Sequence, residues 1–429
     1  MMRILFIILA AIVVIPGVLI GIEIVREPGR DEPSVAVADV SEQIAKGNYL
    51  ARAGDCMACH TARGGSSYAG GRRIPTPFGD IFSPNITPDT ATGIGSWTSN
   101  DFWRALHNGK SKDGSFLYPA FPYPNYTKVT RADSDAIFAY IKTLSPVHRP
   151  NQPHQLRFPY NQRLLLAGWR ALYFRPGIYS PNPGQSNEWN RGAYLVQGLG
   201  HCNACHTNRN VLGATETRGD LAGGMIPMLN WYAPSLTSDA EAGLGDWQPQ
   251  HIADLLKTGI SPRGTVFGPM AEVVRESLQY LSDRDILAMG GYLKALPQTD
   301  PASKQESIEL LSLQEASSSL KLGAALYEKH CADCHQATGE GVPPAYPPLA
   351  GNRSINTPSA INSIRMVVNG GFPPSTTGNP RPFGMPPFGP AMDDVEVAAV
   401  VSYIRNSWGN RAEFVSPVEV SHYRAVPLD

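Results

Sequence analysis

The chain has 429 residues, which is enough for two to four domains of ordinary size. Its 36 basic and 37 acidic side chains nearly balance, and no run of five basic residues occurs, so the sequence carries no electrostatic signature of nucleic-acid binding. With 41 glycines and 38 prolines the chain is too rich in helix breakers for an all-helical bundle, while a hydrophobic content of 42% excludes global disorder.

The first element in chain order is an uncharged apolar stretch over residues 4–22. A helix of this length, rising 1.5 Å per residue, just crosses a hydrocarbon core of about 30 Å. The alternative is a cleaved export signal, because a small-x-small site exists at residues 36–38, but this site lies well beyond the apolar stretch and after a charged segment. We therefore expect a retained transmembrane anchor at residues 1–25. Arg3 favours an inside N-terminus, which would place the rest of the chain in the periplasm of a bacterium, on its inner membrane.

All six cysteines lie in three copies of the pattern Cys-x-x-Cys-His. The copies consist of Cys56, Cys59 and His60, of Cys202, Cys205 and His206, and of Cys331, Cys334 and His335. Two thiols three residues apart can form thioethers to the two vinyl groups of one haem, and the adjacent histidine can then bind the iron. The sequence therefore predicts three covalently bound haems c.

Three other interpretations of the cysteine pairs are weaker. A disulfide framework does not explain the histidine that follows every pair. A zinc site usually takes four ligands from two such pairs, and three pairs would leave one unmatched. A thioredoxin-like redox pair lacks the surrounding βαβ pattern.

The body of the chain is a threefold repeat. Each haem motif follows a glycine–tyrosine segment, at residues 47–49, 192–194 and 323–327. Each also precedes a predicted amphipathic helix, at residues 135–144, 282–296 and 394–408, which carries a tyrosine at the same phase: Tyr140, Tyr292 and Tyr403. Ser282 is the expected N-cap of the second helix.

We therefore expect a mainly α fold with much irregular loop, in which three tandem cytochrome c-type haem domains follow the transmembrane helix. The domains, called modules 1, 2 and 3 below, span residues 40–150, 185–297 and 318–410. Residues near 150–185 and 297–318 are interpreted as linkers, and residues 411–429 as a C-terminal tail.

The sixth iron ligand can be sought in the loop before each predicted helix, because a low-spin electron-transfer haem commonly has a methionine opposite the histidine. This loop carries Met270 in module 2 and Met385 in module 3, each beside prolines that would stiffen it. Met225 and Met228 are the alternatives in module 2, and Met392 is the alternative in module 3.

Module 1 departs from this pattern, since no methionine occurs between the first two haem motifs. Phe121 stands where the ligand should be, and a phenylalanine cannot bind iron. The first haem is therefore expected to be either open at its sixth position or ligated by a borrowed group, with His107, His148 and His154 available.

At this point the sequence resembles the three-haem cytochrome c subunits of bacterial membrane-bound periplasmic dehydrogenases that oxidise alcohols, aldehydes, gluconate and polyols. The matching segments are residues 47–60, 76–79, 85–88, 118–126, 194–207, 231–234, 267–274 and 403–410. The resemblance implies an electron-transfer subunit without catalytic residues, which passes electrons from a catalytic subunit through three haems to membrane ubiquinone. It also implies Met270 and Met385 as ligands, whereas Phe121 departs from the family pattern.

The retained anchor looks most like that of cytochrome subunits that accompany molybdenum-type aldehyde dehydrogenases, which would add an iron–sulfur subunit to the partners. Two functions of other classes stay open on the sequence. One is a stand-alone membrane cytochrome that feeds a terminal oxidase, and the other is a haem peroxidase that uses an open first haem.

Overall fold

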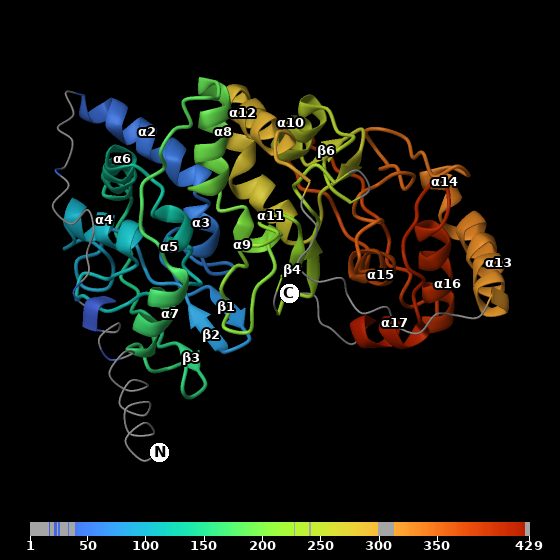
Figure 1. Cartoon of the computed structure of the whole chain (residues 1–429), viewed down its shortest axis with the longest axis horizontal. Coiled ribbons are helices and arrows are strands. Elements are labelled where there is room, and N and C mark those ends of the chain that lie inside the picture. Colours follow the sequence, from blue (N-terminus) through green and yellow to red (C-terminus); the bar gives the residue numbers. More distant parts are fainter. Residues whose placement is uncertain are drawn as a thin grey trace, which may run out of the picture. The chain divides into compact units, whose positions relative to one another are not determined.

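The structure is a computed structural model that describes residues 17, 21–23, 25, 33, 39–226, 228–239, 242–298 and 313–424. Most regular structure in this part of the chain is helical (Figure 1). The elements up to the second haem motif are α2 (Val40–Ala53), α3 (Cys56–Cys59), β1 (Arg73–Thr76), β2 (Gly79–Phe82), α4 (Ser99–Asn108), α5 (Tyr123–Tyr126), α6 (Arg131–Ile141), β3 (Gln155–Leu156), α7 (Leu165–Tyr173), α8 (Asn187–Gln197) and α9 (Asn203–His206). The later elements are β4 (Gly224–Ile226), β5 (Trp231–Ala233), α10 (Pro249–Thr258), β6 (Ile260–Ser261), β7 (Gly264–Thr265), α11 (Pro269–Glu276), the 3-10 helix η1 (Leu278–Tyr280), α12 (Asp283–Lys294), α13 (Leu313–His330), α14 (Ala332–His335), α15 (Ile361–Asn369), α16 (Asp394–Arg405) and α17 (Pro417–Arg424).

The chain forms two compact units. Unit 1 consists of residues 1–183, 194–201 and 211–214, and unit 2 consists of residues 184–193, 202–210 and 215–429. Unit 1 therefore holds the first haem motif, and unit 2 holds the second and the third. The predicted boundaries of modules 1 to 3 stay predictions.

Each module is built on a close crossing of two helices, one before and one after the haem motif. The pairs are α2 with α6, α8 with α12, and α13 with α16, of which the first and last are seen side by side in Figure 1. At each crossing a glycine of the glycine–tyrosine segment faces a backbone carbonyl of the second helix. A Cβ atom would lie 1.9 Å from the Ala136 oxygen at Gly47, 2.0 Å from the Ala288 oxygen at Gly192, and 2.2 Å from the Ala399 oxygen at Gly323. Only glycine allows such an approach, so this glycine sets the crossing.

The three predicted helices exist, with different ends. The second is confirmed as α12, where the Asp285 N–H donates to the Ser282 hydroxyl at 3.2 Å, so that Ser282 is the N-cap. The first, α6, begins four residues before the predicted start, because Thr130 caps it by accepting from the Asp133 N–H. The third, α16, ends at Arg405 and not at residue 408.

Trp408 was predicted to continue the third helix, and this is wrong. Its backbone is left-handed, with φ at 54°. Its ring packs instead on Tyr327 and Tyr403, at centroid distances of 4.8 and 5.6 Å. A tryptophan at helical spacing can therefore belong to the core through a turn that follows the helix.

The segments predicted as linkers contain regular structure. Residues 150–185 include β3 and the nine-residue helix α7, and α13 begins at Leu313, within the second predicted linker. The predicted C-terminal tail contains α17, in which Val420 is fully buried. These helices were not predicted because the prolines and asparagines around their apolar residues are typical of linkers.

Three small antiparallel sheets occur in the described residues, in addition to the predicted helices. The strand orders are β1-β2-β3, β4-β5 and β6-β7. In the first sheet Ile74 pairs with Ile81 and Asp80 pairs with Gln155. Strands this short follow from turn geometry, and no alternating pattern in the sequence is long enough to predict them.

The predicted anchor at residues 1–25 lies almost wholly outside the described residues. Among the helices that the structure does describe, none combines the length and the apolar character needed to cross a membrane.

We predict that Gly192→Ala destabilises module 2 by about 1–3 kcal/mol, because the added methyl group would force α8 and α12 apart at the crossing. The matched control is Gly291→Ala in α12, where an added Cβ meets nothing within 4 Å. This change should stabilise the same module by up to about 1 kcal/mol, since alanine is the better helix former. Calorimetry of the full chain would measure both, and equal effects of the two substitutions would contradict the role of the crossing.

Candidate haem-binding sites

Each Cys-x-x-Cys-His motif forms one tight helical turn, at α3, α9 and α14. In all three, the backbone N–H of the histidine donates to the backbone carbonyl of the first cysteine, at 3.0 Å for His60, 3.0 Å for His206 and 2.9 Å for His335. Residues three apart in such a turn lie on the same side. The turn therefore presents two thiols together, with the histidine directly after them.

The three histidine rings make the same hydrogen bond. Nδ1 lies 2.8 Å from the Pro84 carbonyl oxygen for His60, 2.7 Å from that of Pro234 for His206, and 3.0 Å from that of Pro347 for His335. A carbonyl oxygen can only accept, so Nδ1 must carry the proton and Nε2 keeps its lone pair. Burial also lowers the pKa of each ring, to about 4 for His206, so the neutral form is favoured. All three rings are thus prepared to bind a metal through Nε2.

A glycine with left-handed backbone holds each proline beside its histidine. The Gly70, Gly223 and Gly341 N–H groups donate to the carbonyls of His60, His206 and His335, at 2.7, 2.9 and 3.0 Å. Their φ angles are 70°, 93° and 67°. A Cβ at Gly70 would lie 2.3 Å from the Pro84 carbonyl carbon, and one at Gly341 would lie 2.7 Å from that of Pro347. Sequence reasoning missed this clamp, because its acceptors are backbone atoms that no side-chain motif marks.

No disulfide joins any of the six cysteines, and they are not gathered into a metal cluster. The two thiols of each pair lie on one turn instead. Burial raises the pKa of Cys56 and Cys202 to about 12 and that of Cys331 to about 11, so these thiols are neutral. Throughout the described residues no three side chains of the types His, Cys, Asp and Glu converge as a metal site. Two neutral thiols and one Nε2 lone pair per turn are the donor set that a covalent haem c needs.

Met385 lies in a loop that is hydrogen-bonded back to the residues directly after α15. It exchanges two backbone hydrogen bonds with Gly371, at 2.8 and 3.0 Å, and its half-buried side chain packs on the core of module 3. The alternative, Met392, is 4% exposed and belongs to that core itself. The loop geometry therefore favours Met385 as the methionine that can face a haem.

Met270 is the second residue of α11, after Gly268 and Pro269. Gly268 has a φ of 56°, and a Cβ there would lie 2.8 Å from the Trp231 ring, so the chain bends tightly against this tryptophan. Met225 and Met228 are 36% and 52% exposed and point to solvent from the β4 hairpin. The arrangement favours Met270 over both alternatives.

Phe121 of module 1 lies near the first cysteine pair. Its ring is 5.2 Å from that of Tyr126, whose hydroxyl donates to the Gly54 carbonyl at 2.9 Å. Burial is the main cause that raises the pKa of Tyr126 well above its ordinary range, and Cys56 and Cys59 add to the shift.

The histidines proposed as substitutes for a methionine in module 1 differ in their chemistry. His154 accepts the Phe82 N–H at Nδ1, at 3.2 Å, so its proton lies on Nε2 and no lone pair remains there for iron. His148 is on the surface, 3.6 Å from Asp89. His107 is buried, stacks on Trp103 at 4.4 Å and has Nδ1 2.9 Å from the Thr127 oxygen. Of the three, only His107 combines burial with a lone pair on Nε2.

The structure adds a fourth histidine, which sequence reasoning missed. His201 belongs to unit 1, and its ring lies 5.6 Å from that of Tyr126. Its Nδ1 is 2.7 Å from the Leu199 carbonyl oxygen, so Nε2 again keeps its lone pair. His201 directly precedes Cys202, so its position in the sequence associates it with the second haem motif. Nothing in the sequence indicates that its ring lies in unit 1.

Within unit 2, Arg353 of module 3 contacts module 2, which holds the second haem motif. The Arg353 guanidinium donates to the Ser235 carbonyl at 2.9 Å and lies 5.1 Å from the centre of the Trp247 ring. Burial lowers the pKa of Arg353 to about 10, which leaves it charged at neutral pH. After burial itself, this charge is a further cause of the lowered pKa of His206. Asn362 adds to the contact by bonding the Tyr232 backbone twice, at 3.0 and 2.8 Å.

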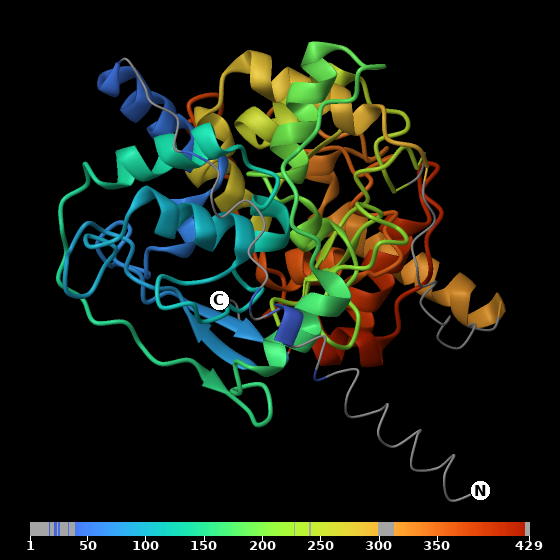
Figure 2. The ribbon, with the colours of Figure 1, turned by 60° about the vertical axis from the view of Figure 1, so that its left-hand side comes forward.

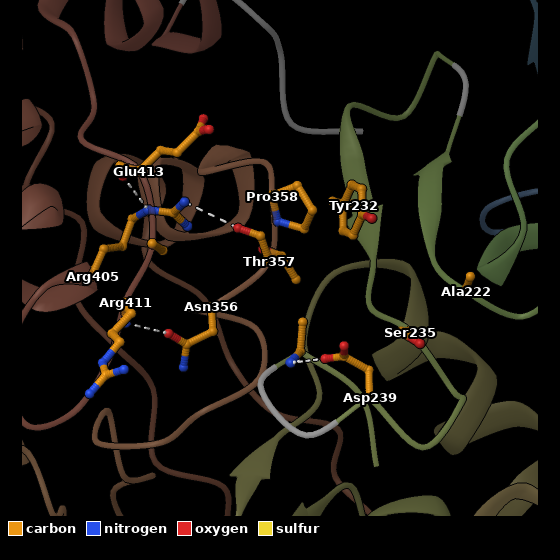
Figure 3. A pocket seen from close by; sticks show the side chains of 12 residues that line it. Ala222, Tyr232, Ser235, Asp239, Asn356, Thr357, Pro358, Arg405, Arg411 and Glu413 are labelled. Atoms are coloured by element: carbon orange, nitrogen blue, oxygen red, sulfur yellow. Dashed lines mark hydrogen bonds between the residues drawn. The ribbon is translucent and has the colours of Figure 1, made fainter. Parts of the chain in front are cut away.

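A pocket of about 250 Å³ lies beside this contact, between residues of modules 2 and 3 (Figure 3). Arg405 dominates its wall and donates to the carbonyls of Ile355, Thr357 and Glu413, at 2.6, 3.1 and 3.0 Å. None of the cysteines, histidines and methionines assigned to the haems lines it. The Arg405 guanidinium in its wall is already hydrogen-bonded to backbone carbonyls. The pocket is therefore distinct from the candidate haem sites.

Comparison with known proteins agrees with this chemistry. The family model for cytochrome c matches residues 44–145 and 320–408. The cytochrome c subunit of the quinone alcohol dehydrogenase of Gluconacetobacter polyoxogenes is 40% identical, over 87% of this chain and 82% of its own length. The gluconate 2-dehydrogenase cytochrome c subunit of Pantoea cypripedii is 38% identical, over 86% of each chain. The fructose dehydrogenase cytochrome subunit of Gluconobacter japonicus is 38% identical, over 92% of this chain and 86% of its own.

Each of these three relatives, which are similar over nearly the whole chain, is named as the cytochrome subunit of a dehydrogenase. The chain belongs to the same family, the cytochrome c subunits of dehydrogenase complexes, and is an electron-transfer subunit and not the catalytic one.

Proposed function

We propose that this chain binds three haems c covalently and relays electrons from a catalytic dehydrogenase subunit to membrane ubiquinone. The observation that carries the proposal is the threefold repetition of one prepared site: two thiols on a turn, and a histidine held by a proline carbonyl. Three equivalent sites in one chain are what a relay needs, whereas one site would suffice for a haem catalyst.

The residues of the chain have separate tasks in this relay. A bound haem supplies one-electron chemistry, and the cysteines fix it in place without a dissociation step. The proline carbonyls orient His60, His206 and His335 and increase the basicity of Nε2. Met270 and Met385 are the proposed opposite ligands of the second and third haems. The apolar ring of Phe121 would keep water from the first.

The partner that we propose is a catalytic subunit that oxidises an alcohol or an aldehyde. The names of the relatives, which refer to alcohol, gluconate and fructose dehydrogenases, support a partner of this class. A molybdenum-type catalytic subunit with an iron–sulfur subunit is the form we propose for an anchored chain.

The apolar stretch at residues 4–22 is the proposed membrane anchor, with modules 1 to 3 in the periplasm. Haem is attached to cytochromes c on that side of the inner membrane, and Arg3 at the start of the stretch agrees with this orientation. The anchor would keep the relay close to ubiquinone, which stays in the bilayer.

We predict that the chain, isolated with its complex, exceeds its polypeptide mass by three haems and brings a dehydrogenase with it. Adding the substrate of that dehydrogenase should reduce the haems, and a ubiquinone analogue should then reoxidise them. Intact mass and visible spectra measure both. A gain of two haems or fewer would refute the relay of three, and a chain isolated without a dehydrogenase would favour a stand-alone cytochrome.

We predict that Met270→Ala and Met385→Ala each convert one haem to high spin and lower its reduction potential, because the thioether no longer stabilises the reduced iron. Met392→Ala is the control in module 3. Replacing this buried methionine by alanine should lower the free energy of unfolding by about 2–5 kcal/mol, but it should not change the spin state of any haem. Electron paramagnetic resonance of the oxidised chain reads the spin state. The ligand assignment fails if Met392→Ala, and not Met385→Ala, produces the high-spin signal.

We predict that Arg353→Gln lowers the reduction potential of the second haem by on the order of tens of millivolts, because a nearby positive charge disfavours the ferric state. Arg353→Lys keeps the charge and should retain most of the potential. A spectroelectrochemical titration compares the two variants with the unchanged chain. Equal potentials in all three would show that solvent screens this charge from the haem.

A further inference from the structure

The segment first interpreted as a linker has an unusual charge pattern. Residues 147–187 contain no aspartate or glutamate and five arginines, although the whole chain has a net charge of −1. The same residues contain most of the large apolar side chains that are exposed among the described residues of unit 1. Basic and apolar character therefore coincide on one stretch of surface.

Helix α7 lies in the middle of this segment and is held firmly by one face. Ala167, Arg170 and Phe174 are at most 1% exposed. The Arg170 guanidinium lies 4.9, 5.5 and 4.6 Å from the rings of Phe116, Tyr123 and Phe174, and it donates to the Asn108 carbonyl at 2.6 Å. A helix with so many contacts on one face is a fixed part of unit 1.

The opposite face of α7 is apolar and exposed. Leu165 and Leu172, two turns apart, are 52% and 62% exposed, and Tyr173 is 37% exposed. Leu164 before the helix and Phe158 in the preceding loop are 66% and 80% exposed. Scattered exposed leucines need no explanation, but a cluster around one helix marks an interaction surface. We call these five residues the α7 surface.

Three exposed arginines flank α7 in the sequence. Arg157 and Arg163 precede the helix and Arg175 follows it, and all three are exposed. Trp169 and Tyr160 add aromatic rings with a polar group. Leucine, tryptophan and tyrosine on one side of a helix, bordered by arginines, are typical of helices that lie at the interface of a bilayer.

The end of the proposed anchor is fixed beside this helix. Glu23 is the first charged residue after the apolar stretch, and its buried carboxylate lies 3.5 Å from Arg170 Nε. Residues 21–23 are beside α7 in both views of the chain (Figures 1 and 2). The neighbouring Ile22 and Val25 are 50% and 79% exposed. The point where the chain would leave the membrane is thus next to the buried face of α7.

We propose that the α7 surface rests on the headgroup region of an anionic phospholipid bilayer, at the place where the anchor leaves it. This inference rests on the proposed anchor, but it adds a second, independent contact with lipid. The arginines match anionic headgroups, and the leucines and aromatic rings match the boundary with the acyl chains. A surface of the catalytic subunit would have to supply both an acidic rim and a site that borders on the membrane exit.

The test places a fluorescent bimane label at Leu172→Cys in the full, haem-loaded chain, in which the introduced cysteine is the free thiol. The matched control is Val40→Cys at the first residue of α2, which is 63% exposed against 62% for Leu172. The helices α2 and α7 lie apart in Figure 1. Both chains are reconstituted into phosphatidylglycerol-rich vesicles, with and without lipids that carry a nitroxide quencher on the acyl chain. Comparing each label with and without the quencher removes the effect of the haems.

We expect the nitroxide lipids to quench the label at position 172 at least threefold more than the label at position 40. The difference should decrease when phosphatidylcholine replaces the anionic lipid. Equal quenching at the two positions, in a chain that still floats with the vesicles, overturns the α7 surface and leaves the anchor standing. A chain that does not float overturns both.

A third result would point to the other class of partner. If position 172 is protected from aqueous iodide only when the catalytic subunit is present, and lipid quenching is absent, then the α7 surface is a subunit interface. The lipid proposal is overturned in that case. The side chain at position 172 is exposed, so labelling should leave haem content unchanged, and the visible spectrum checks this.

Discussion

The hydrogen bonds from three histidine rings to the carbonyls of Pro84, Pro234 and Pro347 are the interactions on which each proposed haem site depends. Without them, a buried imidazole could carry its proton on either nitrogen and rotate about its side-chain bonds. With them, the proton is held on Nδ1, the ring plane is fixed, and Nε2 is the nitrogen left to bind a metal. Each bond also joins the motif to a loop that lies 24, 28 or 12 residues away in the sequence.

The second constraint is the glycine that brings two helices together in each module. An axial ligand must be held to within a fraction of an ångström, and small modules with much loop have few helices to provide such rigidity. The carbonyls of Ala136, Ala288 and Ala399 approach their glycines closely enough to exclude any side chain. Burial at this crossing therefore fixes the helix after the motif against the helix before it, and the loops between them have defined ends.

The parts that the sequence predicted are those coded by side chains. Cysteine spacing predicts the three candidate sites. Ser282 correctly marked the start of α12, because its hydroxyl is the capping group. The parts it missed are coded by backbone atoms or by distant packing. No sequence motif marks the proline carbonyls. His201 is next to Cys202, so the sequence associates it with the second haem motif. Trp408 reaches the core from a left-handed turn after α16. The helix α7 was hidden because prolines and asparagines around it indicated a linker.

Module 1 differs from the other two in what holds its ligand loop, and this difference connects Phe121 with α7. The loops around Met270 and Met385 are braced by their own prolines and by contacts within unit 2. The loop that begins at Tyr118 is braced by the arginine-rich segment: Arg163 donates to the Phe116 carbonyl at 2.7 Å and lies 5.1 Å from the Tyr118 ring.

The Tyr118 hydroxyl in turn donates to the Tyr160 carbonyl at 3.0 Å, so the loop is tied to the segment at both its backbone and its ring. In the proposed relay, the loops of Met270 and Met385 would also be held by a bond to iron, whereas the loop of Phe121 would have no such bond and depends on support from outside. Residues 150–185 supply that support, which gives the segment a structural reason to be ordered independently of any surface it contacts. The module for which no methionine ligand is proposed is therefore also the one in which the loop of Phe121 shares its supports with the helix α7.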